Sequence, residues 1–565
     1  MAGKLSEKLV ENSTFSGNHV PKLTKIIYPW SGIFRDACYA LVGSFLMQYV
    51  LISGVLSTDP DEYLHQYSLL TTLMMIAIIW DGINDPIMGF IVEKVHFKLG
   101  KFRPWILIGA LGNTLAVILM FTVRPHGWGF VGTCIAFYLL WDTFFTMNDV
   151  GYWSMLPSLT SDSKERASLT TQTTVATSIG AFLMNICAVL LPTAFQSKGI
   201  GAAPVYAWLA VVASVLFLVS QSLVFFLCKE KKRDPKQEEV SEKTKFLDLF
   251  KIIGKNSQLR AAVLSLFLYY LFAMLLTGIG QNYFYIVFGY GSNTGGMVYT
   301  VLTVFYIIGT VIAQVFYPAL AKRFPKKKII GIALIVCALM YLVFLLCGFP
   351  LFGDNPLAYN KPDEKNMFWI FGGTMWIYYL SATVFFGAQG IIYLCLLVMM
   401  QDSIDYQEWK FGERKESVAF AWRPLTVKIG SALQRGIILA AYAVSGVSVT
   451  INGISTAEGL NNSGWYREHP NGGTVDGVTH AGSLSSDTSL LISNVDKHQQ
   501  LSVLGLIIIG FIVVCLLAMF LILKFGYKID EKKEEEILSD LKLRHEEDAK
   551  AMKAASSKTP DGKKA

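Results

Sequence analysis

The sequence predicts an all-α membrane protein with twelve transmembrane helices in two six-helix bundles. Of the 565 residues, 53% are hydrophobic and only 16% are charged, whereas soluble domains carry about 25% charged residues. Twelve apolar runs are long enough to cross a bilayer, which takes about 20 residues as a helix. A long charged stretch divides these runs six and six, and this layout predicts two repeats facing each other across a central site.

The twelve predicted spans follow the apolar runs of the chain, and several are longer than a straight crossing needs, which predicts tilt or extension beyond the lipid. In chain order they are 30–55, 66–93, 104–123, 128–157, 167–193, 204–228, 261–288, 296–320, 328–348, 368–400, 417–446 and 501–524.

The segments around the spans complete the predicted domain organisation. Between the last two spans lies a stretch rich in Gly, Ser, Thr and Asn, which is interpreted either as a surface loop or as a cap over the outer entrance. The tail alternates Lys and Glu and predicts a short helix near 530–548. The predicted parts are an N-terminal segment (1–28), two bundles (29–228 and 259–526), their linker (229–258), the outer segment (447–500) and the tail (527–565).

Basic residues set the expected orientation, because they gather in cytoplasmic loops. They cluster after the second, sixth and eighth predicted spans, whereas the loops after the first and seventh carry no Lys or Arg. We therefore expect both termini in the cytoplasm and the chain in the cell membrane. The net charge of +7 follows from this bias and does not indicate nucleic-acid binding. The clusters are Lys94, Lys98, Lys101, Arg103, Lys229, Lys231, Lys232, Arg233, Lys322, Arg323, Lys326, Lys327 and Lys328.

Several functional classes find no support in the sequence. The eight cysteines lie in or beside predicted spans and none has CxxC spacing, so neither disulfides nor a zinc site are expected. No cleavable signal peptide is expected either, since residues 1–28 are polar and the first apolar run is a full span. No phosphate-binding glycine loop or catalytic triad pattern appears, and we expect neither an enzyme nor an organic cofactor.

Four aspartates inside predicted spans are the main functional signal: Asp36, Asp81, Asp85 and Asp149. An ionised carboxylate at mid-bilayer costs roughly 2.5–3.5 kcal/mol on insertion scales, so such residues usually face a polar cavity.

The motif WDGINDPIMGF places Asp81, Asn84 and Asp85 on one helical face, because they are three and four residues apart. Two carboxylates this close repel, so either one holds a proton or a cation lies between them. Their hard oxygen atoms suit a small alkali cation or a proton. The alternative is a structural polar patch that pairs with a basic residue on another helix.

The motif WDTFFTMNDVGYWSMLP places Thr146, Asp149 and Trp153 at helical spacing. A carboxylate beside an indole suits a sugar, because the acid accepts hydroxyl protons while the ring covers the C–H face. The alternative makes Trp153 an interfacial residue and Asp149 an ion-pair partner. Arg35 and Asp36 are adjacent and are expected to point in different directions, with Asp36 either accepting sugar hydroxyls or pairing with a neighbouring helix.

Basic residues on the predicted span 417–446 complete the set. Lys428 lies about 11 residues into this span, near mid-membrane by the rise per residue of a helix, and is the expected partner of the Asp81–Asp85 pair. Arg423 lies closer to the cytoplasm. Arg435 lies closer to the outside, where snorkelling explains it.

With these residues in hand, the chain resembles the glycoside–pentoside–hexuronide:cation symporters, the melibiose-permease branch of the major facilitator superfamily. The resemblance covers nearly all of the membrane region. Its most specific part is WDGINDPIMG followed by GKFRPWILIG, with further matches in MNDVGYWSMLPSLT, DSIDYQEWKFGERKES and VKIGSAL. It implies the major facilitator fold.

The resemblance also implies roles for individual positions. Asp81, Asn84, Asp85 and Thr146 match the family's cation site, which implies Na⁺ (or Li⁺ or H⁺) as coupling ion, and Lys428 matches the lysine beside it. The remaining matches concern the sugar and the gate. Asp36, Asp149, Trp153, Arg35 and Tyr393 match sugar-site positions, and Gly89, Lys101 and Arg103 match a cytoplasmic gate.

Three positions depart from the melibiose-type pattern. Thr174 stands where an arginine contacts the sugar, Arg423 replaces a glutamine, and Phe145 replaces a tyrosine. The pocket loses one cation and can regain one from another wall, which leaves a pentoside, another glycoside or a hexuronide open as substrate.

The sequence thus predicts cation-coupled symport of a sugar or glycoside into the cell by alternating access. Two alternatives stay open: a lysolipid-type carrier of related fold, and a sugar sensor that does not transport. The expected partners are the sugar, a monovalent cation and the lipid bilayer, and we expect a monomer.

Overall fold

The computed structural model describes, apart from a few single positions, residues 20–230, 251–351, 370–412 and 422–556. The predicted N-terminal segment, interbundle linker and tail lie partly outside these ranges.

Helical spans occupy all twelve predicted positions. In the N-terminal half they are α2 (Lys22–Ile52), α3 (Pro60–Lys94), α4 (Arg103–Thr122), α5 (Trp128–Leu159), α6 (Ser163–Gln196) and α7 (Ala202–Leu227). In the C-terminal half they are α9 (Ser257–Ala273) continued by α10 (Leu275–Phe288), α11 (Thr294–Arg323), α12 (Lys326–Gly348), α13 (Met375–Phe411), α15 (Trp422–Ser445) and α19 (Lys497–Gly526).

Within the described residues, eleven of these spans are long and apolar enough to cross a membrane. The twelfth, α2, is also long enough, but Arg35 and Asp36 lie within it and lower its hydropathy. Polar residues define several helix starts, because their side chains accept hydrogen bonds from free backbone N–H groups. The Asp59 carboxylate does so for α3 and the Asn256 side chain for α9.

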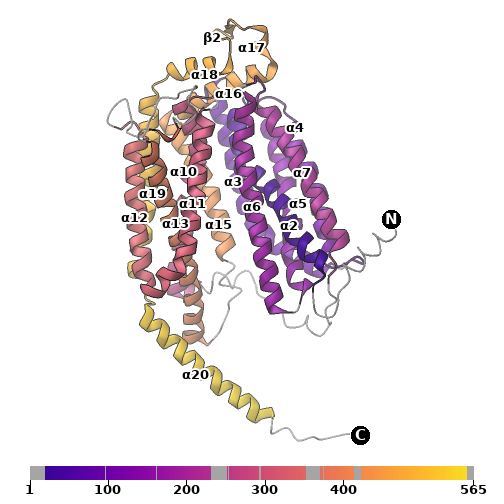
Figure 1. Ribbon diagram of the computed structural model, residues 1–565, viewed down its shortest axis with the longest axis vertical. Helices are drawn as coiled ribbons and strands as arrows, with labels where there is room; N and C mark the ends of the chain where they lie inside the picture. The colour runs from indigo at the N-terminus through magenta and orange to yellow at the C-terminus, as the bar shows by residue number, and fades with distance from the viewer. Residues whose placement is uncertain are drawn as a thin grey trace.

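The helices form two bundles side by side, as Figure 1 shows. In the first half, α2 packs against α6 and α7, and α4 packs against α5. In the second half, α13 packs against both α11 and α12. The halves meet where α3 contacts α15 and where α6 contacts α11. The predicted fold class is confirmed.

The outer segment 447–500 is folded, which favours the cap over the surface loop. It contains α16 (Val447–Ser463), α17 (Trp465–Glu468), the antiparallel hairpin β1 (Gly473–Val475) and β2 (Val478–His480), and α18 (Leu484–Ser493). We call residues 447–493 the cap and this end of the molecule the cap end. Asp487 organises the cap, accepting hydrogen bonds from the Tyr466 hydroxyl at 2.6 Å and the Ala481 N–H at 2.9 Å, with His480 Nδ1 at 2.8 Å.

The cap bonds to both halves of the molecule. On the N-terminal half, Asn462 donates to the Ser53 carbonyl at 2.9 Å and Asn452 donates to the Ser57 carbonyl at 3.0 Å. On the C-terminal half, the Thr488 hydroxyl donates to the Tyr290 carbonyl at 3.0 Å. Figure 1 shows the cap lying across the upper ends of the helices.

The opposite end carries α20 (Glu531–Ser556), which is longer than the helix predicted near 530–548. Lys326, at the start of α12, donates to Asp402 of α13 and to Glu534 of α20. The Trp409 indole donates to Asp540 at 2.8 Å. Because the basic residues after α3 and around the turn from α11 to α12, such as Lys94, Lys322 and Lys328, lie at this end, we call it the basic end.

Candidate functional site

An acidic niche lies where α3 of one half meets α15 of the other. Lys428 Nζ is 2.7 Å from Asp81 Oδ2 and 2.5 Å from Asp85 Oδ2, so one ammonium group bridges both carboxylates. The Thr146 hydroxyl of α5 donates to Asp81 Oδ1 at 3.2 Å. A Cβ on Gly82 would lie 3.4 Å from Leu425, which shows how closely α3 and α15 approach here. The structure therefore brings together four of the predicted residues.

Asn84, the remaining predicted residue of this group, is half-buried on α3 one turn from Asp81. Asp142 is buried on α5 one turn from Thr146. Its carboxyl interacts electrostatically with Asp81, Asp85 and Lys428, so it belongs to the same acidic surroundings.

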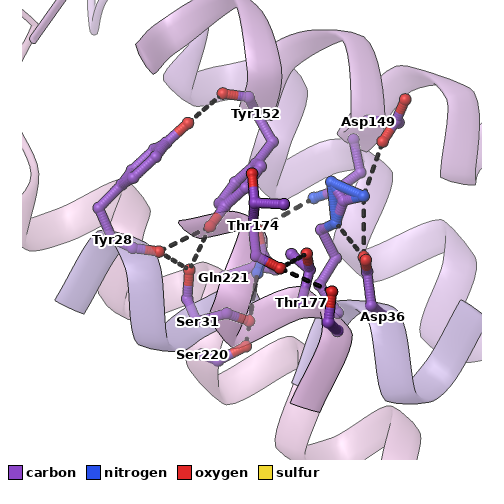
Figure 2. A network of polar contacts seen from close by, with 12 residues as sticks. Tyr28, Ser31, Asp36, Asp149, Tyr152, Thr174, Thr177, Ser220 and Gln221 are labelled. Carbon is purple, nitrogen blue, oxygen red and sulfur yellow. Dashed lines mark hydrogen bonds and ion pairs between the residues drawn. The ribbon is translucent and has the colours of Figure 1, made fainter. Parts of the chain in front are cut away.

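A second cluster forms around Arg35 of α2, shown in Figure 2. Its Nη2 atom lies 2.9 Å from Asp36 Oδ1 and 2.8 Å from Asp149 Oδ1 of α5, and Nε donates to Asp36 Oδ1 at 3.0 Å. The expectation that Arg35 and Asp36 point in different directions is wrong. The arginine side chain is long enough to turn back onto its neighbour, where the guanidinium group joins the two acids.

Aromatic rings hold this guanidinium group in place. The guanidinium carbon of Arg35 lies 4.9 Å from the ring centre of Tyr152, 5.5 Å from that of Phe145 and 5.6 Å from that of Trp153. These distances are typical of cation–π contact. Tyr152 in turn stacks on Tyr28, with ring centres 4.5 Å apart and planes within 5°. Each tyrosine hydroxyl donates to the backbone carbonyl of the other residue (Figure 2).

The cluster keeps capacity for a ligand. Arg35 is 4% exposed, and its buried Nη1 atom has no hydrogen-bond partner among the residues that the structure describes. The Asp149 side chain is 39% exposed, so part of this carboxylate faces an accessible space. Thr174 of α6 is exposed one turn from Thr177, and its hydroxyl donates to the Thr170 carbonyl of its own helix.

Arg423 and Tyr393 lie together in the C-terminal half. Arg423 Nη2 donates to the Tyr393 hydroxyl at 2.7 Å, and the guanidinium carbon lies 5.9 Å from the centre of that ring. Tyr393 stacks on Tyr269, with ring centres 5.4 Å apart. Arg423 is exposed, so further N–H groups face an accessible space.

Tyr39 connects the two acidic clusters and was not among the predicted residues. It lies on α2 one turn beyond Asp36, within electrostatic range of Asp81, Asp149 and Lys428. Its ring centre is 4.7 Å from that of Phe145. The spacing of three residues from Asp36 could have identified it, since such residues share a helical face.

Further contacts join the halves toward the cap end. The Gln48 amide of α2 donates to Asn282 of α10 at 2.6 Å. Arg435 Nη2 donates to the Gly43 carbonyl of α2 at 3.0 Å, so snorkelling is not the reason for its position. Asp85, with 38% of its side chain exposed, lies on the other side of these contacts.

The predicted gate residues lie at the basic end. Glu230, just after α7, accepts hydrogen bonds from the backbone N–H groups of Lys101 and Arg103, each at 2.8 Å. A carboxylate is stabilised at such a helix start by the free N–H groups and the helix dipole. Gly89 of α3 has open space around it, because a Cβ there would meet nothing within 4 Å.

Comparisons with known proteins identify the family of this chain. The family model described as MFS/sugar transport protein matches residues 61–461. The raffinose carrier protein of Pediococcus pentosaceus is 26% identical over 448 residues, which cover 77% of this chain and 65% of the carrier. The isoprimeverose transporter of Lactiplantibacillus pentosus is 24% identical over 451 residues, covering 80% and 85% of the two chains.

The raffinose carrier and the lactose permease of Lactobacillus delbrueckii are longer proteins, of which this chain spans 65% and 62%. Among solved structures, a bacterial homologue of the human lysosomal transporter Spinster matches with a TM-score of 0.54 and 14% identity, over 89% of this chain and 96% of that one. At this identity, the likeness supports the fold alone. The family match and the sugar-transporter relatives together show that the chain belongs to the MFS/sugar transport family, among the glycoside–pentoside–hexuronide symporters of the major facilitator superfamily.

Proposed function

We propose that this protein is a secondary transporter that couples the movement of a monovalent cation to the uptake of a sugar or glycoside. The observation that carries the proposal is the presence of two acidic clusters within the membrane region. Lys428 bridges the acids of one cluster across the two halves, and Arg35 bridges the acids of the other within the N-terminal half. Charged residues within membrane spans usually mark an ion or substrate path.

The niche of Asp81 and Asp85 has the chemistry of a monovalent cation site. It offers carboxylate oxygens and the Thr146 hydroxyl, which are hard ligands suited to Na⁺, Li⁺ or a proton. In this structure the Lys428 ammonium group lies where a cation would be neutralised by the same two acids. The cation and the lysine therefore compete for one position.

This competition supplies a coupling mechanism. Lys428 belongs to one half and its acids belong to the other, so the ion pair also fastens the halves together. A cation that displaces Lys428 breaks this ion pair between the halves. The coupling must be reciprocal, so the sugar tightens cation binding by the same factor as the cation tightens sugar binding.

The Arg35 cluster has the chemistry of a polyol site. Asp36 and Asp149 accept hydroxyl protons, the free N–H group of Arg35 Nη1 can donate, and Trp153 offers a ring face. Arg423 supplies a separate cation on the other half, which could pair with a carboxylate of a hexuronide. Relatives are named for raffinose, lactose and isoprimeverose, so these sugars and a hexuronide form the first substrate panel.

The test is uptake of this panel into proteoliposomes that contain the full chain, with and without an imposed Na⁺ gradient. We expect accumulation of at least one sugar above its outside concentration only with the gradient. Asp85→Cys should abolish stimulation by the cation while weak sugar binding persists. Asp61→Asn, an acid in the first turn of the same helix, is the matched control.

The coupling proposal fails if Asp81→Cys and Asp85→Cys both leave accumulation intact. Saturable sugar binding without accumulation in the unmodified protein would indicate a sensor. Uptake of a lysolipid in place of every sugar would indicate the lipid carrier. Proton coupling would appear as uptake driven by a pH gradient without Na⁺, with the same dependence on Asp85.

A further inference from the structure

An apolar groove runs along the outer face of the C-terminal half, between α11 and α12. Both helices pack extensively on α13 but touch each other little, so they diverge and α13 forms the floor. The groove has a volume of about 470 Å³. It is separate from the acidic clusters, and its lining is almost entirely apolar, including Ile312, Phe316, Ile332, Val336 and Ile391.

Small residues explain why the groove exists. Gly309 of α11 touches the backbone of α13 so closely that a Cβ there would lie 2.2 Å from the Thr383 carbonyl oxygen. Gly387 of α13 faces Gly309 in return, with its Cβ position 3.1 Å from the Gly309 carbonyl oxygen. Such small residues let helices approach closely in membranes. They also leave room in the groove at Gly309 and Gly387, where no side chain projects.

The groove faces the lipid rather than the protein interior. On its walls, Phe316 is 59% exposed and Ile332 is 53% exposed, although both lie within membrane spans. From Gly309 to Phe324 the groove runs about 22 Å at the rise of a helix, which is roughly the depth of one bilayer leaflet. A furrow of this length and polarity suits an acyl chain.

The mouth of the groove at the basic end carries positive charge. Lys322 and Arg323 end α11 and are exposed, and Lys328 begins α12 with its ammonium group 5.4 Å from the ring centre of Phe324. Phe324 itself lines the groove. Within the described part of the chain, none of these three basic side chains pairs with a carboxylate. The neighbouring Lys327 has a different surrounding, because its ammonium group lies 5.8 Å from the ring centre of Tyr527.

We propose that this groove is a binding site for an anionic phospholipid, with one acyl chain between α11 and α12 and the phosphate headgroup at Lys322, Arg323 and Lys328. Basic clusters beside membrane helices attract anionic headgroups, and the apolar furrow directly below fixes the position of the chain. The bound lipid would fill the space between α11 and α12 and support the half that carries Lys428.

The test is native mass spectrometry of the delipidated full chain, titrated with phosphatidylglycerol or with phosphatidylcholine of the same acyl chains. We expect one tight phosphatidylglycerol site, preferred about tenfold over phosphatidylcholine. Combined Lys322→Gln, Arg323→Gln and Lys328→Gln should remove this preference. Single Lys328→Gln should weaken the preference, and Lys327→Gln is its matched control, because it removes one positive charge from the neighbouring position.

A second variant tests the apolar part independently. Ile312→Trp with Ile332→Trp narrows the groove from its two exposed walls, where the added volume can be accommodated, and should weaken binding of both lipids. Thermal unfolding without lipid checks that each variant is folded. Equal binding of the two lipids to the unmodified protein, or unchanged binding in both variants, would overturn the proposal. The proposal would also be overturned if the unmodified protein were a dimer that Ile312→Trp with Ile332→Trp dissociates, because the groove would then hold a second copy of the chain.

Discussion

We predict that docking of the cap depends on pH through Glu458. Its side chain is fully buried on α16, where its carboxyl accepts hydrogen bonds from the Ala202 N–H and from the Gln196 amide, the latter at 3.2 Å. Asn461 donates to its other oxygen at 3.2 Å, and Tyr290 also faces it. These partners are uncharged. Burial therefore dominates and raises the pKa of Glu458 from 4.5 to about 7.

The sign follows from linkage between protonation and docking. The docked cap holds the proton more tightly than a released cap, where the pKa of the carboxyl would be near its ordinary value. Docking is therefore most stable below pH 4.5 and weakens as the pH rises to about 7, after which it changes little. The pKa difference of about 2.5 corresponds to about 3 kcal/mol. Between pH 5 and pH 8, the opening constant should rise by about 50- to 100-fold.

Hydrogen–deuterium exchange of cap peptides, corrected for the intrinsic pH dependence of exchange, measures this opening. Glu458→Gln should keep the cap docked and remove the pH dependence. Glu468→Gln, on the exposed turn α17, should retain it. The reasoning is refuted if the unmodified cap opens equally at both pH values, or if Glu458→Gln shows the same pH dependence as the unmodified protein.

Three further predictions concern the clusters and the cap. Arg35→Gln leaves two carboxylates without their shared cation and should cost about 2–4 kcal/mol, seen as a lower unfolding temperature that Arg35→Lys partly restores; an unchanged temperature would contradict the assigned pairing. Lys428→Gln removes the competing ammonium group from the acidic niche, so Na⁺ should stabilise the protein at roughly tenfold lower concentration. An unchanged midpoint in a thermal-shift titration with Na⁺ would count against this competition. Gly54→Ala should increase exchange in the cap, because φ is +68° and a Cβ would lie 2.5 Å from Gly459; Gly199→Ala, with φ of +72° and open space, separates strain from the clash.

The sequence predicted the spans well because a membrane helix needs a long apolar run, and that signal is local. It also predicted which residues gather in the acidic niche, since Asp81 and Asp85 share a helical face and Lys428 lies at matching depth. The pairing of Arg35 with Asp36 was missed. Helical spacing describes where Cβ atoms point, whereas a long arginine side chain can turn back along its own helix.

Long-range features could not be predicted in the same way. The contacts of Glu458 with Ala202 and Gln196 join residues more than 250 positions apart, so no spacing within the chain signals them. The groove between α11 and α12 arises from how far two helices diverge, which depends on packing against α13. Tyr39 was predictable only in part. Its spacing from Asp36 shows that the two share a helical face, whereas its proximity to Lys428 depends on how the two halves are arranged.

The helix α20 is anchored to a single half of the molecule. Its bonds run to Lys326 and Trp409, both in the C-terminal half, and its 26 residues extend about 39 Å from that end. When this half tilts, the far end of α20 therefore moves through a larger distance than the helices of the bundle do. A fluorophore attached there, read against one beside Lys98, would report the swing between the halves without touching either acidic cluster.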